Sequence, residues 1–167
     1  VIDPEQLDFI NITTSSHNHT DHLDAETLQA LYKSNPNLKM VLPAANIEFA
    51  EKRLGLPQLE MIGIDDKNPV SVDQFTFHGI NAAHNEVERN ELGQPKFMGF
   101  VVRFGPWSIY HSGDTLWHGS LVNELLSHRI DLALLPINGN NPARRVAGNL
   151  NGSEAAALAK AIGARVT

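Results

Sequence analysis

The chain has 167 residues, 42% of them hydrophobic, and a formal net charge of −6 at pH 7. This length and apolar content suit one hydrophobic core, so we predict a single domain over residues 1–167. The acidic balance argues against nucleic acid or an acidic membrane as a partner. Because cysteine is absent, disulfides and thiolate ligands are excluded, and only histidine and oxygen atoms remain as metal ligands. No apolar run approaches the roughly 20 residues of a membrane span, and the first residues do not resemble a signal peptide, so we expect a cytoplasmic protein.

The first half of the chain alternates between apolar strands and amphipathic helices. An apolar run at residues 9–13 predicts a buried strand, and Asp24 is a suitable N-cap for a helix over residues 25–32. The same reasoning predicts a strand over residues 39–42 and a helix over residues 45–54. This alternation indicates an α/β layer arrangement.

The second half is a series of apolar strands followed by helices. In chain order we predict strands at 75–83, 97–104 and 107–111, a helix at 120–127, a strand at 132–136 and a helix at 153–162. The short turn between residues 104 and 107 predicts a hairpin, and therefore an antiparallel part of the sheet. The continuous apolar run at 132–136 predicts a strand buried on both faces. Asn151 and Glu154, three residues apart, predict a capping box at the start of the last helix.

A cluster of ionisable side chains lies between the first strand and the first helix. His17, His19, Asp21 and His22 fall within six residues. If the backbone is extended here, His17 and His19 point the same way, whereas Asp21 and His22 are adjacent and cannot both do so. This spacing suits two neighbouring metal ions, since imidazole and carboxylate are ordinary ligands of zinc-like ions. The alternative is a polar loop in which histidines happen to gather.

Two further side chains stand at predicted strand ends. His84 follows the strand at 75–83, and Asp114 follows the strand at 107–111 within Ser-Gly-Asp-Thr. Strands that end at one edge of a sheet can bring such distant side chains together. Taken alone, His84 fits a structural role and Asp114 fits a turn cap.

The pattern His-x-His-x-Asp-His after a strand resembles the signature of the metallo-β-lactamase superfamily, whose members are mostly hydrolytic metalloproteins. The resemblance implies an α/β fold of the αβ/βα four-layer sandwich type and two divalent ions. It implies that His17, His19 and His84 bind one ion, that Asp21 and His22 bind the second, and that Asp114 bridges them. It also implies strands before the motif and a further histidine beyond Thr167, so we expect a fragment truncated at both ends.

The ligand set predicts metal-assisted hydrolysis. Divalent ions lower the pKa of a bound water from about 15.7 to about 7, which makes hydroxide available, and they polarise a carbonyl or phosphoryl oxygen. Asp21 is the predicted catalytic residue, because it could orient the hydroxide. Histidine and aspartate ligands favour zinc, while manganese or iron also fits.

Later segments resemble the L-ascorbate-6-phosphate lactonase-like branch of the superfamily. The similar stretches are residues 83–85, 134–140 and 149–151. This resemblance implies that a metal-bound hydroxide opens a lactone of a sugar-derived or phosphorylated small molecule, with manganese as the implied ion.

Candidate substrate-binding residues lie near these stretches. Arg144 and Arg145 could bind a phosphate through bidentate hydrogen bonds, or be solvated loop residues. Asparagines could recognise sugar hydroxyls or simply build turns, and the candidates are Asn138, Asn140 and Asn149. Trp117 and His118 could line the mouth of the site, although Trp117 fits the core equally well. For His111 we expect a buried structural role rather than contact with a ligand, and for His78 and His128 a structural or surface role.

Two other functions stay open. The same ions would serve a phosphodiesterase of this superfamily, although the acidic charge disfavours polymeric RNA. A non-catalytic, metal-binding regulatory protein is the second alternative. The expected partner is a small-molecule substrate, with no nucleic acid and no membrane, and homo-oligomer formation is left open.

Overall fold

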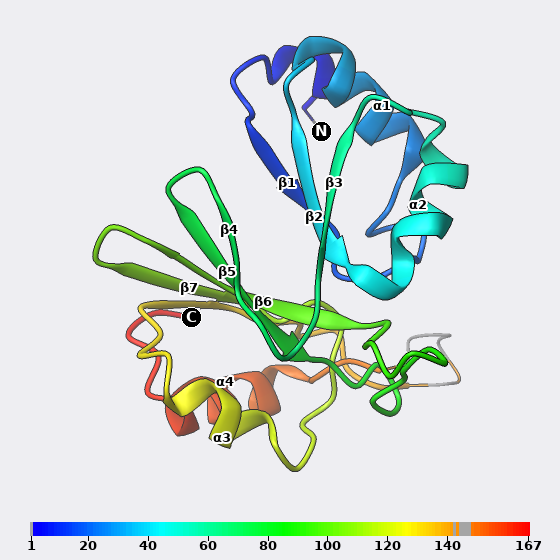
Figure 1. Ribbon diagram of the computed structural model, residues 1–167. Coiled ribbons are helices and arrows are strands. Elements are labelled where there is room, and N and C mark those ends of the chain that lie inside the picture. Colours follow the sequence, from blue (N-terminus) through cyan, green and yellow to red (C-terminus); the bar gives the residue numbers. More distant parts are fainter. Residues whose placement is uncertain (1, 142, 144–147) are drawn as a thin grey trace.

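The fold is built on two β-sheets that face each other (Figure 1). The computed structural model describes residues 2–141, 143 and 148–167. The first sheet contains three parallel strands in the order β1-β2-β3. They are β1 (Ile12–Thr14), β2 (Lys39–Pro43) and β3 (Glu60–Ile64). Its outer face is covered by α1 (Ala25–Ser34) and α2 (Ile47–Leu54), with the short 3-10 turns η1 (Pro4–Gln6) and η2 (Ala44–Asn46) beside them.

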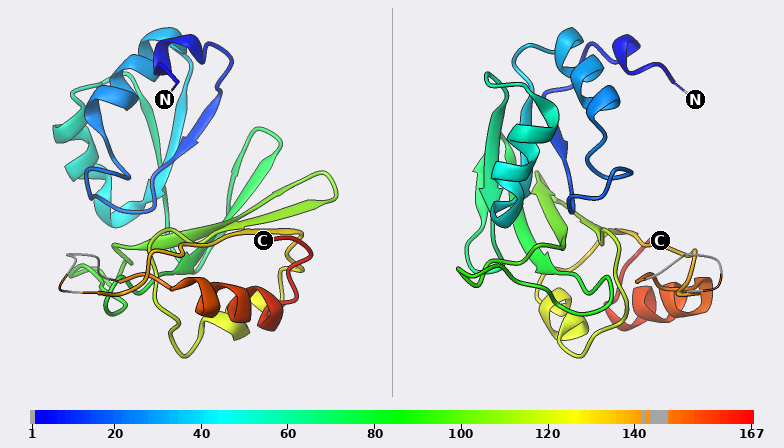
Figure 2. Two further views of the ribbon diagram at one scale, coloured as in Figure 1. Left: turned by 180° about the vertical axis from the view of Figure 1, so that it is seen from behind. Right: turned by 90° about the vertical axis from the view of Figure 1, so that its right-hand side faces the viewer.

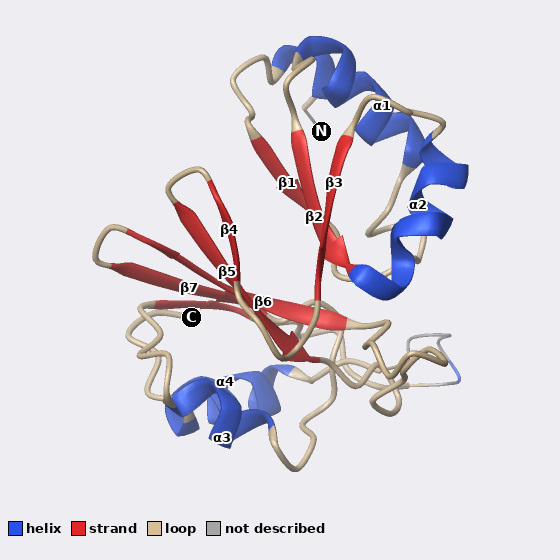
Figure 3. Cartoon of the chain, in the orientation of Figure 1, coloured by secondary structure: helices blue, strands red, loops and turns tan. Residues whose placement is uncertain are grey.

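The second sheet contains five strands in the order β4-β5-β6-β7-β8. They are β4 (Val70–Val72), β5 (Phe75–Asn81), β6 (Met98–Phe104), β7 (Trp107–His111) and β8 (Leu132–Leu134). Neighbours from β4 to β7 run antiparallel, and β7 and β8 run parallel. The helices α3 (Leu121–Leu126) and α4 (Gly152–Ala161) lie on the outer face of this sheet (Figures 2 and 3).

Three hydrophobic clusters separate the four layers. Leu28, Met40 and Leu54 belong to the cluster between α1, α2 and the first sheet. Val41 and Phe77 belong to the cluster between the two sheets. A third cluster joins the second sheet to α3 and α4. The helix–sheet–sheet–helix order confirms the predicted αβ/βα sandwich.

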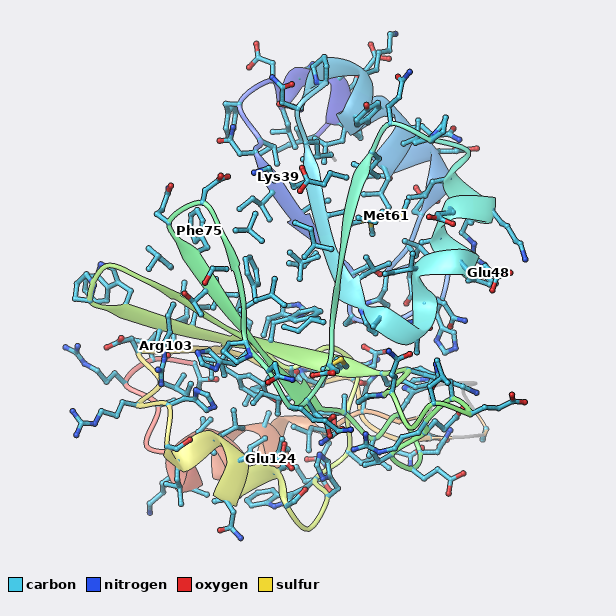
Figure 4. The ribbon with its side chains drawn as sticks, viewed as in Figure 1. Lys39, Glu48, Met61, Phe75, Arg103 and Glu124 are labelled. Atoms are coloured by element: carbon cyan, nitrogen blue, oxygen red, sulfur yellow. The ribbon has the colours of Figure 1, made fainter. Side chains whose placement is uncertain are left out.

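The two sheets are also linked by an ion pair at their splayed ends. Lys39 Nζ at the start of β2 lies 3.0 Å from Asp73 Oδ1 in the β4–β5 turn. Figure 4 labels Lys39 and, just after that turn, Phe75. A half-exposed pair of this kind contributes little stability, so the sheets are held together chiefly by the apolar cluster between them.

The predicted caps are confirmed at the starts of α1 and α4, and a glycine ends α2. The Asp24 side chain accepts a hydrogen bond from Thr27 N at 2.8 Å at the start of α1. Asn151 and Glu154 form the predicted capping box of α4. Gly55 ends α2 in the left-handed conformation, at φ +61°, where glycine is favoured.

The expectation for residues 132–136 was wrong. The strand β8 is only three residues long, and the Leu134 side chain is 47% exposed rather than buried on both faces. On the side away from β7, the described residues add to β8 only an isolated parallel bridge from Leu132 to Val166. An apolar run predicts burial only where chain covers both faces, and the sequence of the run itself cannot tell whether it does.

Among the helices of the described residues, none has the length and apolar character needed to cross a membrane.

Candidate metal centre

The histidine-rich loop is fixed between the two sheets. Ser15 N donates to Val41 O of β2 at 3.0 Å, and Met98 N of β6 donates to Ser16 O at 3.0 Å. The fully buried Leu23 side chain anchors the end of the loop in the α1 and α2 cluster. The loop therefore has a defined position relative to both sheets.

The backbone of the loop is a tight turn and not the extended segment that we expected. His19 O accepts hydrogen bonds from His22 N at 3.1 Å and from Leu23 N at 2.9 Å. The turn folds His22 back toward His17. The turn thereby brings the three histidines of the motif together, whereas an extended backbone would point them in different directions.

Four imidazole rings lie close together, and three of them, those of His17, His19 and His84, lie against one aromatic side chain. The centroid of the His17 ring lies 4.1 Å from that of His22 and 4.5 Å from that of His19, and the His19 and His84 centroids are 5.0 Å apart. Phe97, just before β6, lies 4.9 Å from His17 and stacks on His84 at 5.4 Å. The buried Phe97 ring forms an apolar wall behind the histidines and excludes water from that side.

Two hydrogen bonds connect the segment that follows β5 with the segment that follows β7. Ala83 N donates to Thr115 Oγ1 at 3.0 Å, and Leu116 N donates to Ala83 O at 2.8 Å. His84, which follows Ala83, and Asp114, which precedes Thr115, are thereby held side by side, with 3.8 Å between His84 Nδ1 and Asp114 Oδ2. Two distant parts of the chain thus deliver one nitrogen and one carboxylate to the histidine cluster.

The carboxylates of Asp114 and Asp21 both face His22. His22 Nε2 lies 3.3 Å from Asp114 Oδ1 and 3.6 Å from Asp21 Oδ2. The Asp114 side chain is 17% exposed, whereas that of Asp21 is 74% exposed. Asp114 therefore lies inside the cluster and Asp21 at its rim.

The cluster has the features of a cation site. His17, His22 and Asp114 each offer a ligand atom, and these atoms lie within 4.8 Å of one another. Among the described residues, the buried His17 Nε2 and His84 Nδ1 have no hydrogen-bond partner. Buried polar atoms without partners are rare in proteins, and a bound cation would satisfy these nitrogens. The donor set therefore fits one or two divalent ions.

Local electrostatics keep the central ring neutral and the carboxylate charged. Burial, and to a smaller extent the neighbouring His22, lowers the pKa of His17 to about 3. A hydrogen bond that His22 donates to the Asp114 carboxylate raises the pKa of His22. Burial alone would raise the pKa of Asp114, but the hydrogen bond and charge of His22 outweigh it, so that pKa is lowered. At neutral pH the centre thus offers an imidazole lone pair beside an anion, as a metal requires.

Ser16 and the close approach of Gly113 to it were missed by the sequence analysis. Ser16 Oγ lies 3.0 Å from Nδ1 of both His17 and His22. Gly113, at φ +60°, passes so close that a Cβ on it would lie 2.7 Å from Ser16 Cβ. In the sequence, this contact is indicated only by a serine just before the first histidine and a glycine just before the aspartate, and both residue types are common in turns.

The predicted substrate-binding residues have mixed outcomes. Arg144 and Arg145 lie outside the described residues. Asn138 is exposed and pairs with Asn151 in an isolated antiparallel bridge, and the Trp117 side chain is 42% exposed. The exposure of Trp117 removes the core alternative for that residue, and a substrate contact stays a prediction for both.

Two of the remaining candidates are occupied by contacts within the protein. His118 Nε2 lies 2.9 Å from Asn81 O. The expectation of a buried His111 was wrong: it is exposed, and its Nδ1 accepts a hydrogen bond from Gly113 N at 3.2 Å. A cavity of about 530 Å³ adjoins the centre beside β8. It is lined by His22, Asp114, Leu134, Ile137 and Thr167, among others.

Comparisons with known proteins agree with this geometry. A family model described as "Beta-lactamase superfamily domain" matches residues 2–167. A UPF0173 metal-dependent hydrolase of Thermococcus kodakarensis is 28% identical over 142 residues, which cover 83% of this chain and 59% of that protein. The chain thus spans less than two thirds of that relative.

Two solved structures share the fold. The metallo-beta-lactamase fold protein YhfI from Bacillus subtilis matches with a TM-score of 0.72 at 22% identity, over 99% of this chain and 66% of that one. The isothiocyanate hydrolase from Delia radicum gut bacteria matches with a TM-score of 0.73 at 19% identity, over 99% and 64%. At these identities they establish the fold alone. The family model carries the assignment: this chain belongs to the beta-lactamase superfamily.

Proposed function

We propose that this chain carries the metal centre of a hydrolase that opens a lactone of a small, sugar-derived or phosphorylated molecule. The observation that carries the proposal is the convergence of four imidazoles and Asp114 around the buried Nε2 of His17, which has no hydrogen-bond partner among the described residues. The similarity to a metal-dependent hydrolase supports the reaction class. The lactone rests on the resemblance of residues 134–140 and 149–151 to the lactonase-like branch.

The residues present would hold two ions. Divalent ions, when bound, would lower the pKa of a water molecule and polarise the substrate carbonyl. His17, His19 and His84 would hold one ion, and Asp21 and His22 the other, with Asp114 between them. Nitrogen and oxygen donors of this kind favour zinc and also accept manganese.

The side chains have separate tasks in the proposed reaction. His17, with its lowered pKa, is neutral at pH 7 and needs to release no proton before it can act as a ligand. Asp21, exposed at the rim, can accept a hydrogen bond from the attacking water and orient it. The water oxygen adds to the lactone carbonyl carbon, the ring carbon–oxygen bond breaks, and the proton lost by the water passes to the departing alkoxide.

The test combines metal content with turnover. Metal is quantified by mass spectrometry on the purified protein, and a panel of lactones and phosphodiesters is assayed before and after chelation. We expect two equivalents of metal and lactone opening that chelation abolishes. His19→Ala should lose both metal and activity. The control is His78→Ala, which should keep both, because His78 lies on β5 of the second sheet and its ring packs against that of His128.

The other outcomes separate the rival functions. Metal with phosphodiester cleavage but no lactone opening would replace the substrate class and keep the hydrolase. Metal without any turnover would favour a regulatory, metal-binding role. Lack of metal in the native protein would refute the hydrolase proposal.

A further inference from the structure

Two adjacent serines precede His17, and their contacts differ. Both are buried, with Ser15 3% and Ser16 4% exposed. Ser15 Oγ donates to the backbone carbonyl of His17 at 2.9 Å. Ser16 Oγ instead lies 3.0 Å from Nδ1 of His17 and 3.0 Å from Nδ1 of His22. One hydroxyl therefore touches the rings of two histidines that the proposed centre assigns to different ions.

The chemistry of the hydroxyl restricts the tautomers of both rings. A neutral imidazole carries its proton on one nitrogen and a lone pair on the other, while a serine hydroxyl has one proton and two lone pairs. Ser16 can therefore donate to only one Nδ1, so at least one of the two rings must carry its proton on Nδ1. Its two lone pairs can also accept from both Nδ1–H groups at once.

The surroundings of the Nε2 atoms favour acceptance from both rings. His17 Nε2 is buried and has no partner within the part of the chain that the structure describes, so a proton there would be an unpaired buried donor. His22 Nε2 faces the carboxylates of Asp21 and Asp114, between which a cation would need a lone pair and not an N–H. With ions present, both rings are therefore protonated on Nδ1.

We propose that Ser16 is a positioning residue that accepts hydrogen bonds from Nδ1–H of both His17 and His22 and thereby directs both Nε2 lone pairs to the metal ions. The inference rests on the proposed metal centre and deepens it. Because one oxygen serves a ligand of each ion, a change at Ser16 alters both metal positions together. The hydroxyl acts through the histidines and does not itself touch the ions.

Neighbouring backbone holds the Ser16 hydroxyl in place. Ser16 O accepts from Met98 N at 3.0 Å, which fixes the residue against β6. Gly113 lies against its side chain, where a Cβ would come within 3.1 Å of Ser16 Oγ. The turn that presents Asp114 therefore also covers the hydroxyl and keeps it aimed at the two rings.

The test compares Ser16→Ala with the matched control Ser15→Ala. Zinc(II) affinity of the metal-free protein is measured by competition with a chromogenic chelator, after circular dichroism has shown that each variant is folded. Removal of a residue that orients a metal ligand typically weakens affinity by about 10- to 100-fold, and we expect Ser16→Ala to do so for both ions. Ser15→Ala loses a bond to backbone only and should bind zinc like the wild type.

Ring nitrogen NMR of the zinc-loaded protein supplies a readout that simple packing would not change. We expect slowly exchanging Nδ1–H protons on His17 and His22 in the wild type and in Ser15→Ala, and their loss in Ser16→Ala. Ser16→Thr, which keeps the hydroxyl, should restore the signals and the affinity. An equal defect in Ser16→Thr and Ser16→Ala would assign the effect to packing against Gly113 and overturn the proposal.

The result separates this inference from the proposed function. Wild-type zinc affinity and intact Nδ1–H signals in Ser16→Ala would refute the role of Ser16, whatever the activity of the protein. Two bound ions that depend on Ser16, in a protein that hydrolyses no lactone, would confirm the role and refute the lactonase proposal.

Discussion

Gly148 illustrates how a single missing side chain shapes the candidate centre. It adopts φ +70°, and a Cβ added there would overlap the backbone carbonyl and approach the imidazole of His84. Only a residue without a Cβ lets this segment lie against His84. The next residue, Asn149, is buried, and its side chain helps to lower the pKa of Asp114 through a hydrogen bond.

We therefore expect Gly148→Ala to displace His84 and to weaken zinc binding by at least about tenfold. The matched control is Gly93→Ala, in the loop after His84. Gly93 has a similar φ of +76°, but no atom lies within 4 Å of the added Cβ. That variant should lose only about 1 to 2 kcal/mol of stability through backbone strain, with unchanged zinc affinity. Equal zinc affinity in both variants would contradict the packing argument.

His128 should make the stability of the folded protein depend on pH. Burial, and to a smaller extent the neighbouring His78 and Arg103, lowers its pKa to about 4. In the unfolded chain the group titrates near 6.5, so between pH 4 and 6.5 the unfolded state binds more protons. The free energy of unfolding should therefore rise with pH across this window and lose this contribution at lower pH.

His128→Gln should reduce that rise by about 1 kcal/mol, a value that allows for solvent screening at this half-buried position. Urea unfolding at pH 4.5, 5.5 and 7, with metal-free protein, measures the difference. An identical pH dependence in wild type and variant would show that His128 is not the group responsible.

The individual residues show what sequence can and cannot reveal about the centre. The motif from His17 to His22 could be found because its spacing is unusual, and Asp114 because a glycine precedes it. Phe97 and Ser16 could not, since an aromatic residue before a strand and a serine in a turn are common. Their contribution comes from contacts with residues that are distant in sequence or that the turn at His19 brings close.

At the scale of single elements, the start of α4 depends on reciprocal hydrogen bonds. Asn151 Oδ1 accepts from Glu154 N at 3.0 Å, and Glu154 Oε2 accepts from Asn151 N at 2.8 Å. We expect Asn151→Ala to lower the free energy of unfolding by about 1 kcal/mol and the melting temperature by about 2 to 4 °C. Asn123→Ala, at an exposed position inside α3, is the control and should change either value little. A melting temperature equal to that of the wild type would show that the box does not stabilise α4.

Most elements could be predicted because their signals are local. Alternating or continuous apolar residues defined the strands, and Asp24 and the capping box marked helix starts. Three errors concern the first strand, β8 and the extended backbone expected at His17. The buried strand expected at residues 9–13 is instead β1 (Ile12–Thr14), which is not fully buried, and Phe9 is 70% exposed. All three depend on what packs against the segment, which periodicity within the segment does not report.

At the scale of the whole molecule, the candidate ligands come from three separate parts of the chain. The motif loop follows β1 and forms backbone hydrogen bonds with β2 of the first sheet and β6 of the second. His84 and Asp114 follow strands of the second sheet. A bound ion would thus link parts of the chain that are otherwise held by the apolar cluster between the sheets. Periodicity and turn signals could not show that these sheets face each other, since no local pattern encodes their relative orientation, and only the resemblance of the histidine motif to a known superfamily implied it.

Metal removal should therefore lower global stability. A ligand present at about 1,000 times its Kd stabilises the native state by about 4 kcal/mol, which for a chain of this size corresponds to about 8 to 16 °C in melting temperature. Thermal melts with zinc and with a chelator measure the difference. In His19→Ala the two melts should nearly coincide, and a chelator effect as large as in the wild type would contradict the assigned site.

The wide separation of these ligands along the chain also determines when the centre can assemble during translation. The histidine motif leaves the ribosome first, but its cluster is completed only by Asp114, after most of both sheets has been synthesised. Non-local contacts of this kind form late in folding. A nascent chain that has exposed only the motif would have isolated histidines with weak affinity for metal. Tight binding would begin once Asp114 has emerged, so metal acquisition marks a chain whose two sheets have already met.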